Sequence, residues 1–530
     1  MPRGRQIING TEYVYEYDSK WDGEKQYTSH NRNYIGKMVN GVFVPNKKYK
    51  LQQELEAATN RPRGPVPSVK SQRLFYGATY LLDSIGKQLG VTGDLRQCFP
   101  DLDEKILSIA YFLILEDPKP MSRFPKWART HVHPYGKDIP SQRSSELFSQ
   151  INEDAKQSFF RAQSNRRLET EYLAYDTTSI SSYSKLIKQV RWGRNKEHDP
   201  LAQINLALVY GQDSRLPVLF RKLPGNITAV MTLQKTLADI DFLNFSKVKL
   251  VMDRGFYSEA NVNTLYQKHY KFVMAVRIGL KLVQKYLKPV RESMLTRVNY
   301  SSRDGLYGYS QTIIWPYTEN KSRSGQVVKS EKRLYLHLYY NARRTSDDQI
   351  ALNKMLDVLE EELLTNQLNA ANESRYVRYY EVNKTPKRGI QLTPKQEAID
   401  DAQKNYGYFA LISNSIKDPW EALRVYRAKD IVEKAFGNLK ERLNVRRELV
   451  SSEENLDGKL FVQFIALIYL ARIDKVMRDN DLYKDYTIQE LLDEMDVIEC
   501  FEQPGKKTHI GEMTKKQLAL YEAFGIDPPS

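Results

Sequence analysis

The chain has 530 residues, of which 41% are hydrophobic and 27% charged, and its formal net charge is +15. This length predicts several domains, because single hydrophobic cores stop growing at roughly 250–300 residues. We expect neither a membrane span nor a secretory signal, since no apolar run of the required length is present. Cys98 and Cys500 are the only cysteines, which argues against a disulfide framework and fits a reducing cytoplasm. The positive charge favours a polyanionic partner, with nucleic acid first.

Residues 1–70 predict β-hairpins followed by a basic linker. Aromatic and polar residues alternate around Tyr13, Tyr15 and Tyr17, and Asn-Gly pairs at 9–10 and 40–41 are typical of hairpin turns. The segment 61–67 is rich in proline and arginine. An extended basic segment of this kind fits a narrow DNA groove, but a plain linker is the simpler interpretation.

Residues 71–165 carry apolar residues at helical spacing. Helices are predicted at 75–89, 103–115, 141–152 and 155–160. The basic residues between them favour a DNA-binding domain, while a helical scaffold explains the pattern equally well.

At residue 171 the apolar period changes from helical spacing to alternation. Three strands are predicted in succession, and a helix, a strand, a helix and a strand follow up to residue 276. This is the order of the ribonuclease H-like fold. We therefore predict an α/β fold with a ribonuclease H-like catalytic core in two parts and an N-terminal mixed β/helical DNA-binding region. The core covers 166–280 and 401–480, a β-rich insertion covers 281–400, and a C-terminal helical tail covers 481–530.

Two aspartates stand out because each ends or closes an apolar, strand-like run. Asp176 follows Tyr-Leu-Ala-Tyr, and Asp253 follows Lys-Leu-Val-Met. Carboxylates at the C-terminal edge of a sheet can share hard, oxygen-seeking ions such as Mg²⁺. Either aspartate alone is equally well explained as a turn former or a helix cap.

The stretch 426–440 predicts a single amphipathic helix. At about 100° per residue, Tyr426, Lys429, Glu433 and Lys440 fall within one arc of roughly 60°. An ordinary surface helix also has one charged and one apolar face. Together with the two aspartates, however, Glu433 predicts a metal-dependent nuclease site.

These motifs resemble those of bacterial insertion-sequence transposases of the DDE type, in the family-four superfamily. Such enzymes have a first Asp on the first strand, a second in an Asp-Arg-Gly-Phe-like motif, and a Glu in a Tyr-x2-Arg-x3-Glu-x6-Lys signature. The signature here reads Tyr426-x2-Lys429-x3-Glu433-x6-Lys440, and the second Asp begins Asp253-Arg254-Gly-Phe. Lys429 departs from the signature, because lysine keeps the charge but loses the bidentate fork of arginine. The resemblance covers about 165–480.

The resemblance implies a role for each matching residue. Asp176, Asp253 and Glu433 would be the catalytic metal ligands for two Mg²⁺ ions, with Mn²⁺ as a substitute. Tyr426, Lys429, Lys440 and Arg254 would contact DNA phosphates. Relatives stack a flipped base on an aromatic side chain. The candidates here are Phe409 and Tyr408, with Trp315 a weaker one, although a buried strand aromatic is the simpler interpretation of each.

The predicted function is therefore that of a Mg²⁺-dependent DNA transposase. It would act on double-stranded DNA, cleaving the element ends with water and joining the freed 3′-hydroxyl to target DNA. The family also implies a homodimer or a larger synaptic complex, in the bacterial cytoplasm and associated with the nucleoid. Two alternatives remain, a domesticated sequence-specific DNA-binding protein and a structure-selective nuclease on the same fold.

Overall fold

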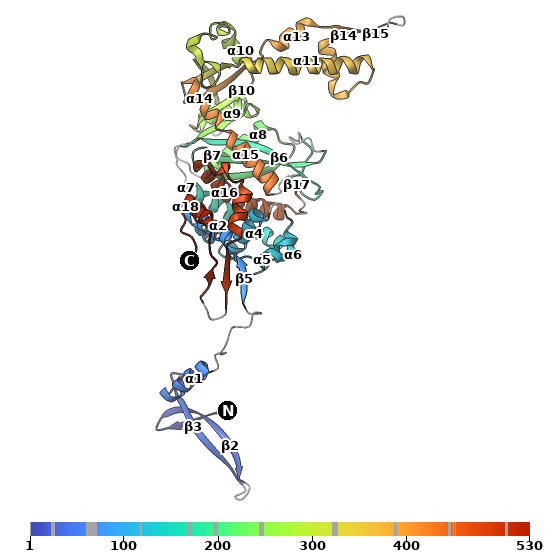
Figure 1. Ribbon diagram of the computed structural model, residues 1–530. Coiled ribbons are helices and arrows are strands. Elements are labelled where there is room, and N and C mark those ends of the chain that lie inside the picture. Colours follow the sequence, from blue (N-terminus) through green and yellow to red (C-terminus); the bar gives the residue numbers. More distant parts are fainter. Residues whose placement is uncertain are drawn as a thin grey trace. The chain divides into compact units, whose positions relative to one another are not determined.

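The computed structural model in Figure 1 divides into two compact units. The first comprises Met1–Arg73 with Phe501–His509, and the second Leu74–Cys500 with Ile510–Ser530. The structure describes residues 2–22, 27–59, 71–116, 119–166, 171–193, 200–242, 248–320, 327–385, 389–443, 447–448, 450, 452–503 and 507–530. The basic linker predicted at 61–67 lies outside these residues. In the described part of the chain, no helix is long and apolar enough to cross a membrane.

The first unit is built on a four-stranded antiparallel sheet in the order β1-β2-β3-β4. Its elements are β1 (Arg3–Ile8), β2 (Thr11–Asp22), β3 (Tyr27–Val39), β4 (Val42–Pro45) and helix α1 (Lys47–Thr59). Both Asn-Gly pairs lie in the turns as predicted, with φ of 50° and 78° at Asn9 and Gly10. Positive φ at both central residues is the requirement of the two-residue hairpin turn, which asparagine and glycine meet at low cost.

The helices predicted between 71 and 165 are confirmed, and two short helices that were not predicted join them. They are α2 (Gly77–Gln88), α3 (Val91–Cys98), α4 (Asp103–Leu115), α5 (Phe124–Ala128), α6 (Ser141–Gln150) and α7 (Glu153–Asn165), with a 3₁₀ turn at Met121–Arg123. The unpredicted α3 is short and contains Gly93, which weakens a helical pattern.

A ten-stranded mixed sheet forms the centre of the second unit, in the order β11-β12-β13-β16-β10-β9-β6-β7-β8, with β17 paired to β6. Antiparallel β6, β7 and β8 are followed by helix, strand, helix and strand, as the sequence predicts. The strands are β6 (Leu173–Ser182), β7 (Gln203–Gly211), β8 (Pro217–Pro224), β9 (Lys249–Met252), β10 (Lys271–Val276), β11 (Tyr300–Ser301), β12 (Leu306–Asn320), β13 (Val327–Tyr340), β16 (Tyr408–Ser413) and β17 (Arg447–Glu448). The helices between the core strands are α8 (Ala229–Phe242) and α9 (Glu259–Gln267), with a 3₁₀ turn at Arg254–Phe256.

The region predicted as a β-rich insertion contributes to this same sheet. Strands β12 and β13 pair with each other, and β13 pairs with β16 of the core. The boundary drawn at residue 280 therefore passes through one continuous sheet. The rest of the region is mostly helical: α10 (Lys281–Leu287), 3₁₀ turns at Lys288–Val290, Arg297–Asn299 and Ala370–Asn372, α11 (Ala342–Leu364), α12 (Glu373–Tyr379), the hairpin β14 (Tyr380–Thr385) and β15 (Gly389–Pro394), and α13 (Gln396–Gln403).

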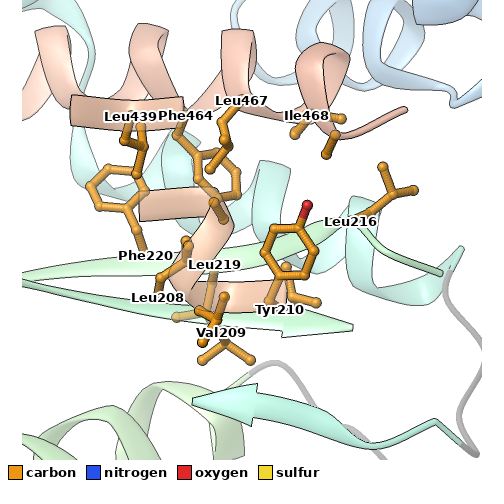
Figure 2. Packing of buried hydrophobic residues seen from close by; sticks show 14 of the residues in the cluster. Leu208, Val209, Tyr210, Leu216, Leu219, Phe220, Leu439, Phe464, Leu467 and Ile468 are labelled. Carbon is orange, nitrogen blue, oxygen red and sulfur yellow. The ribbon is translucent and has the colours of Figure 1, made fainter. Parts of the chain in front are cut away.

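The main core lies between the sheet and a long apolar helix, α16 (Glu453–Asp479). Figure 2 shows Phe464, Leu467 and Ile468 of α16 facing side chains of β7 and β8. Phe464 lies 5.3 Å from Phe220 of β8 and 5.4 Å from Phe160 of α7, measured between ring centroids. Burying each such side chain contributes about 1.5–3 kcal/mol. This aromatic contact joins the helical region before residue 165 to the sheet.

The remaining elements surround this core. They are α14 (Pro419–Arg427), α15 (Asp430–Gly437), a π-helical turn (Asn438–Arg442), a 3₁₀ turn (Leu482–Lys484), α17 (Ile488–Asp496), α18 (Lys515–Ala523) and the short strands β5 (Gln72–Phe75), β18 (Glu499–Glu502) and β19 (His509–Ile510). Helix α15 packs against β6 and β7, and α14 packs near β9 and β10.

Candidate functional site

The two predicted aspartates lie side by side on neighbouring strands inside the sheet. Strands β6 and β9 are parallel neighbours, and their last registered pair is Tyr175 with Met252. Asp176 follows Tyr175 within β6, and Asp253 follows Met252, the last residue of β9. Because β9 ends there, Asp253 is held in extended conformation at the start of the following 3₁₀ turn. The predicted strand-end placement is therefore confirmed for Asp253 and wrong for Asp176, which lies inside β6 and pairs with Leu208 of β7.

Asp176 faces the side of the sheet on which α15 lies. The Tyr175 hydroxyl is 3.2 Å from the Thr236 hydroxyl of α8, so Tyr175 faces the α8 side. Side chains alternate along a strand, so Asp176 faces the opposite side, where α15 contacts β6. The backbone N–H of Thr177 donates to the Asp176 carboxylate at 2.7 Å, and Asp176 is only 9% exposed.

Asp253 is held by Tyr426 of α14. The Tyr426 hydroxyl donates a hydrogen bond of 2.8 Å to Asp253 Oδ1. Burial and the neighbouring charge of Asp253 raise the pKa of Tyr426 well above its ordinary value. The phenol therefore stays protonated and keeps donating to the carboxylate at every pH at which the protein would work.

The single helix predicted for 426–440 is wrong. Helix α14 ends at Arg427, a tight turn covers Ala428 and Lys429, and α15 begins at Asp430. The turn is closed by an N–H···O bond of 3.1 Å from Lys429 to Tyr426. Neither turn residue is a proline or glycine, so the sequence carries no signal for this break. The predicted apolar face is nevertheless buried.

Lys429 brings the three acids together. Its side-chain ammonium donates to Glu433 Oε1 at 2.7 Å, and the residue is 5% exposed. Burial alone would lower the pKa of Lys429, but the bond to Glu433 and the charges of Asp176 and Asp253 raise it above its ordinary value. The charges of three carboxylates therefore act on the Lys429 ammonium: those of Asp176, Asp253 and Glu433.

The other predicted phosphate contacts lie around this point at different exposures. Arg254 is exposed in the 3₁₀ turn directly after Asp253. Lys440 is half-buried in the π-helical turn. Lys429 itself is buried against Glu433, so it could reach a phosphate only by leaving that partner. Arg427, next to the signature, is bound to Asp304 at 2.5 Å.

A cavity of about 820 Å³ opens beside Asp253 and Tyr426. Phe409, Tyr408 and Arg254 line it, so the sequence-predicted base-stacking candidates and the second aspartate share one wall. Arg344 of α11 and Arg378 of α12 line it as well. Neither arginine was predicted from the sequence, because both lie far along the chain from the motifs and nothing in the pattern indicates this proximity.

The aromatic candidates differ in their surroundings. The Phe409 ring stacks on Tyr339 at 4.8 Å with an interplanar angle of 14°, and the Arg344 guanidinium lies 5.9 Å from its centroid. Tyr408 packs under the Arg291 guanidinium at 4.7 Å. Both rings are half-buried. Trp315 is 2% exposed and donates to Asn263, so the weaker prediction for this residue is wrong in this conformation.

The chemistry of the acid cluster fits a divalent metal ion, although its arrangement does not form a finished site. Carboxylate oxygens are the ligands that Mg²⁺ and Mn²⁺ prefer. Among the described residues, no three His, Cys, Asp or Glu side chains lie close enough together to hold a metal ion. The Glu433 carboxylate instead binds Lys429, while its side chain is 57% exposed and has room to move.

The charges of three acids therefore act on the Lys429 ammonium, beside a cavity lined by four arginines and three aspartates. Residues 167–469 match the family model described as the transposase DDE domain. The match covers more than half of the chain, which therefore belongs to this family of DNA transposases. A search of curated proteins found no match. Among solved structures, the chain is similar to the one described as the cryo-EM structure of piggyBac transposase synaptic complex with hairpin DNA. The TM-score is 0.31 at 10% identity, over 73% of this chain and 78% of that chain.

Proposed function

We propose that the protein is a Mg²⁺-dependent insertion-sequence transposase of the family-four superfamily, and that Asp176, Asp253 and Glu433 are its catalytic acids. The observation that carries this proposal is the convergence of the acids: Asp176 and Asp253 follow paired residues of neighbouring strands, and the buried Lys429 beside them binds Glu433 at 2.7 Å. The family match identifies a DNA transposase, and enzymes of this family generally use divalent metal ions. The signature residues Tyr426, Lys429, Glu433 and Lys440 support the finer family assignment, as does the ribonuclease H-like order of the core strands.

Each acid has a chain partner that orients it for this work. The Thr177 N–H holds Asp176, and the Tyr426 hydroxyl holds Asp253. Glu433 is exposed on α15 and can turn from Lys429 toward the two aspartates. When bound there, divalent ions would lower the pKa of a water molecule and stabilise the leaving oxygen. The Lys429 ammonium would then be released toward a DNA phosphate.

The cavity beside the acids would hold the DNA next to the cleaved bond. Arg254, Arg344 and Arg378 line the cavity, and Asp348 and Asp401 lie 3.8 Å from Arg344 and Arg378 in turn. Phe409, already stacked on Tyr339, offers a preformed aromatic surface for an extruded base. Tyr408 is the second candidate, and Lys440 would contact a phosphate from the π-helical turn. Such contacts place the DNA end within reach of Asp253.

The remaining features of the proposal follow from the family. The substrate would be double-stranded DNA of the element ends and of the target, bound by a homodimer or a larger synaptic complex. The protein would work in the bacterial cytoplasm on nucleoid DNA. The helical region 71–165 would take part in DNA binding, the insertion 281–400 would complete the cavity, and the tail 481–530 would support the core.

The decisive experiment is Mg²⁺-dependent cleavage and strand transfer on DNA that flanks the coding region. Asp176→Asn, Asp253→Asn and Glu433→Gln should each reduce both reactions below detection while leaving DNA binding intact. Asp479→Asn, which removes an exposed acid from the end of α16, is the matched control and should be fully active. Full activity of the three site variants would show that the assignment is wrong.

Two other outcomes would point to the alternative functions. Binding of the flanking DNA by the unmodified protein, without cleavage at any Mg²⁺ or Mn²⁺ concentration, would indicate a domesticated DNA-binding protein. Cleavage of branched DNA without preference for the ends and without strand transfer would indicate a structure-selective nuclease.

A further inference from the structure

The sheet of the first unit has two faces of opposite character. Residues that pair across antiparallel strands share a face, and neighbours along a strand alternate. This assigns one group of side chains to a face that we call the open face. Its aromatic, cationic and amide members are Gln6, Tyr13, Tyr15, Tyr17, Arg32, Tyr34 and Lys37, and the exposed apolar residues Ile8, Val39, Val42 and Val44 share the face.

The opposite face is covered by helix α1. Tyr49 of α1 lies 6.4 Å from the ring of Phe43, and its hydroxyl accepts a bond of 2.7 Å from Arg3. Val14 and Ile35 are 7% and 1% exposed and form the small core of this unit. The helix therefore accounts for the burial on its side of the sheet.

Acidic side chains are confined to the covered face. Glu16 and Glu12 pair there with Arg3 at 3.1 Å and with Arg5 at 3.4 Å. Among the residues of these strands whose side chains are described, the register places no Asp or Glu on the open face. Arg32 and Lys37 are exposed there. The open face is therefore purely cationic, although the strands as a whole carry both charges.

The open face is also aromatic, and its side chains hold one another in place. Tyr34 lies 6.1 Å from Tyr13 and 5.6 Å from Tyr15, measured between ring centroids. The Arg32 guanidinium lies 5.0 Å from the centre of the Tyr15 ring and donates to Gln6 at 2.7 Å. The Tyr34 hydroxyl donates to the same Gln6 oxygen at 2.9 Å. These contacts fix the surface before any ligand binds, which reduces the entropy lost on binding.

We propose that the open face binds duplex DNA in the major groove. From Tyr17 and Arg32 onward the sheet is a ribbon of two strands, β2 and β3, which lie roughly 4.8 Å apart. The major groove is about 12 Å wide and admits a two-stranded β-ribbon. Arg32 and Lys37 would contact phosphates or guanine edges, and the tyrosine hydroxyls and Gln6 would contact phosphates and bases. The inference rests on the proposed function as a DNA transposase and gives the first unit its own part in DNA recognition.

The test uses full-length protein and fluorescence anisotropy with labelled duplexes in EDTA, where cleavage does not interfere. One duplex comes from the DNA that flanks the coding region and one has the same composition in scrambled order. Lys37→Glu should weaken binding of the flanking duplex by roughly tenfold or more and reduce the salt slope by about one for the lost contact. The matched control Lys48→Glu changes the charge equally on exposed α1 and should have a much smaller effect.

Arg32→Ala and Arg5→Ala form a second matched pair. Each removes one exposed arginine from the sheet, the first from the open face and the second from the covered face. Arg32→Ala should weaken binding roughly tenfold and Arg5→Ala by less than about twofold. Far-ultraviolet circular dichroism and the melting temperature should match within each pair, which keeps the comparison valid if one residue contributes to folding.

Equal affinity of both members in both pairs would overturn the inference while leaving Mg²⁺-dependent cleavage, and so the proposed function, untouched. Tighter binding of single strands than of duplexes through Arg32 would also overturn it. Conversely, selective loss of duplex binding in Lys37→Glu and Arg32→Ala would support it even if no DNA were cleaved. The two proposals therefore fail separately.

Discussion

Two buried lysines in the second unit make similar ion pairs and have different surroundings. Lys222 of β8 lies 2.7 Å from Glu453 and 2.7 Å from Asp457, both in the first turns of α16. Lys429 lies 2.7 Å from Glu433. Each lysine side chain is 6% exposed. Distance and burial alone would class the two as equivalent.

The acids around them distinguish the two lysines. Glu453 also accepts the backbone N–H of Lys188 at 3.1 Å, so it is tied to the fold at two places. At Lys429 three carboxylates face one ammonium, and Glu433 is 57% exposed. Three acids and one lysine leave a net charge of about −2 at Lys429, whereas two acids and one lysine leave about −1 at Lys222. The Lys429 cluster should therefore attract a further cation more strongly. Thus one buried ion pair can hold two secondary-structure elements together, while another can neutralise a group of acids until a metal ion replaces the lysine.

Lys222→Met should produce the largest loss of stability. It leaves two carboxylates facing each other at the junction of β8 and α16, each about one-third exposed. Breaking a buried pair from one side costs about 3–5 kcal/mol, and partial exposure of the acids favours the lower end. We expect a loss of about 3 kcal/mol in the free energy of unfolding, measured by urea denaturation, with no recovery on adding Mg²⁺. A loss below about 1 kcal/mol would show that the pair is well solvated.

Lys429→Met should also lower stability, but Mg²⁺ or Mn²⁺ should restore it. Removing the ammonium leaves Asp176, Asp253 and Glu433 to repel one another until another cation neutralises them. At a metal concentration about a hundredfold above the dissociation constant, binding stabilises the folded protein by roughly 2.7 kcal/mol. Thermal melting in EDTA and in Mg²⁺, with Lys222→Met as the control, measures this difference. Equal responses of the two variants would remove the distinction between the clusters.

Acid should destabilise the unmodified protein, because His337 and His133 are buried outside the two lysine clusters. Burial lowers the pKa of His337 and of His133 from 6.5 to about 4. A lowered histidine pKa gives stability that is complete above pH 6.5 and is lost as the pH falls toward 4. Each histidine should cost about 2 kcal/mol at pH 5.

His337→Leu is the variant that tests this pH dependence. His337 is fully buried on β13, and leucine cannot take up a proton there. The variant should lose about half as much stability as the unmodified protein between pH 7 and pH 5, measured by urea denaturation at both values. An unchanged pH dependence would mean that protonation of His337 does not cause the loss of stability in acid. The stabilities of the two lysine variants would then have to be compared at each pH.

The sequence predicted local features of the site well and long-range features poorly. Asp253 was placed correctly at the end of β9, because an apolar run and its end are read from adjacent residues. Asp176 instead lies inside β6, because the polar residues Thr177–Ser182 continue the strand by pairing with β7. The break at Ala428 and Lys429 was missed, since it depends on burying the lysine beside acids from distant strands. Arg344 and Arg378 were missed for the same reason. Their place in the cavity depends on the fold of the region before β16.

Lys429→Arg gives the smallest expected effect and sharpens the comparison most directly. The signature of the family-four superfamily, to which we propose the chain belongs, has arginine at this position, and a guanidinium can bind Glu433 and a phosphate through separate N–H groups. We expect roughly threefold tighter binding of the flanking duplex in Ca²⁺, with little change in melting temperature. Lys222→Arg, its control, should leave DNA binding unchanged and lower stability by about 1 kcal/mol through overpacking. If Lys429→Arg also leaves DNA binding unchanged, Lys429 serves only as the counter-ion of the three acids. Replacing it with a metal ion would then not free the lysine to bind a DNA phosphate.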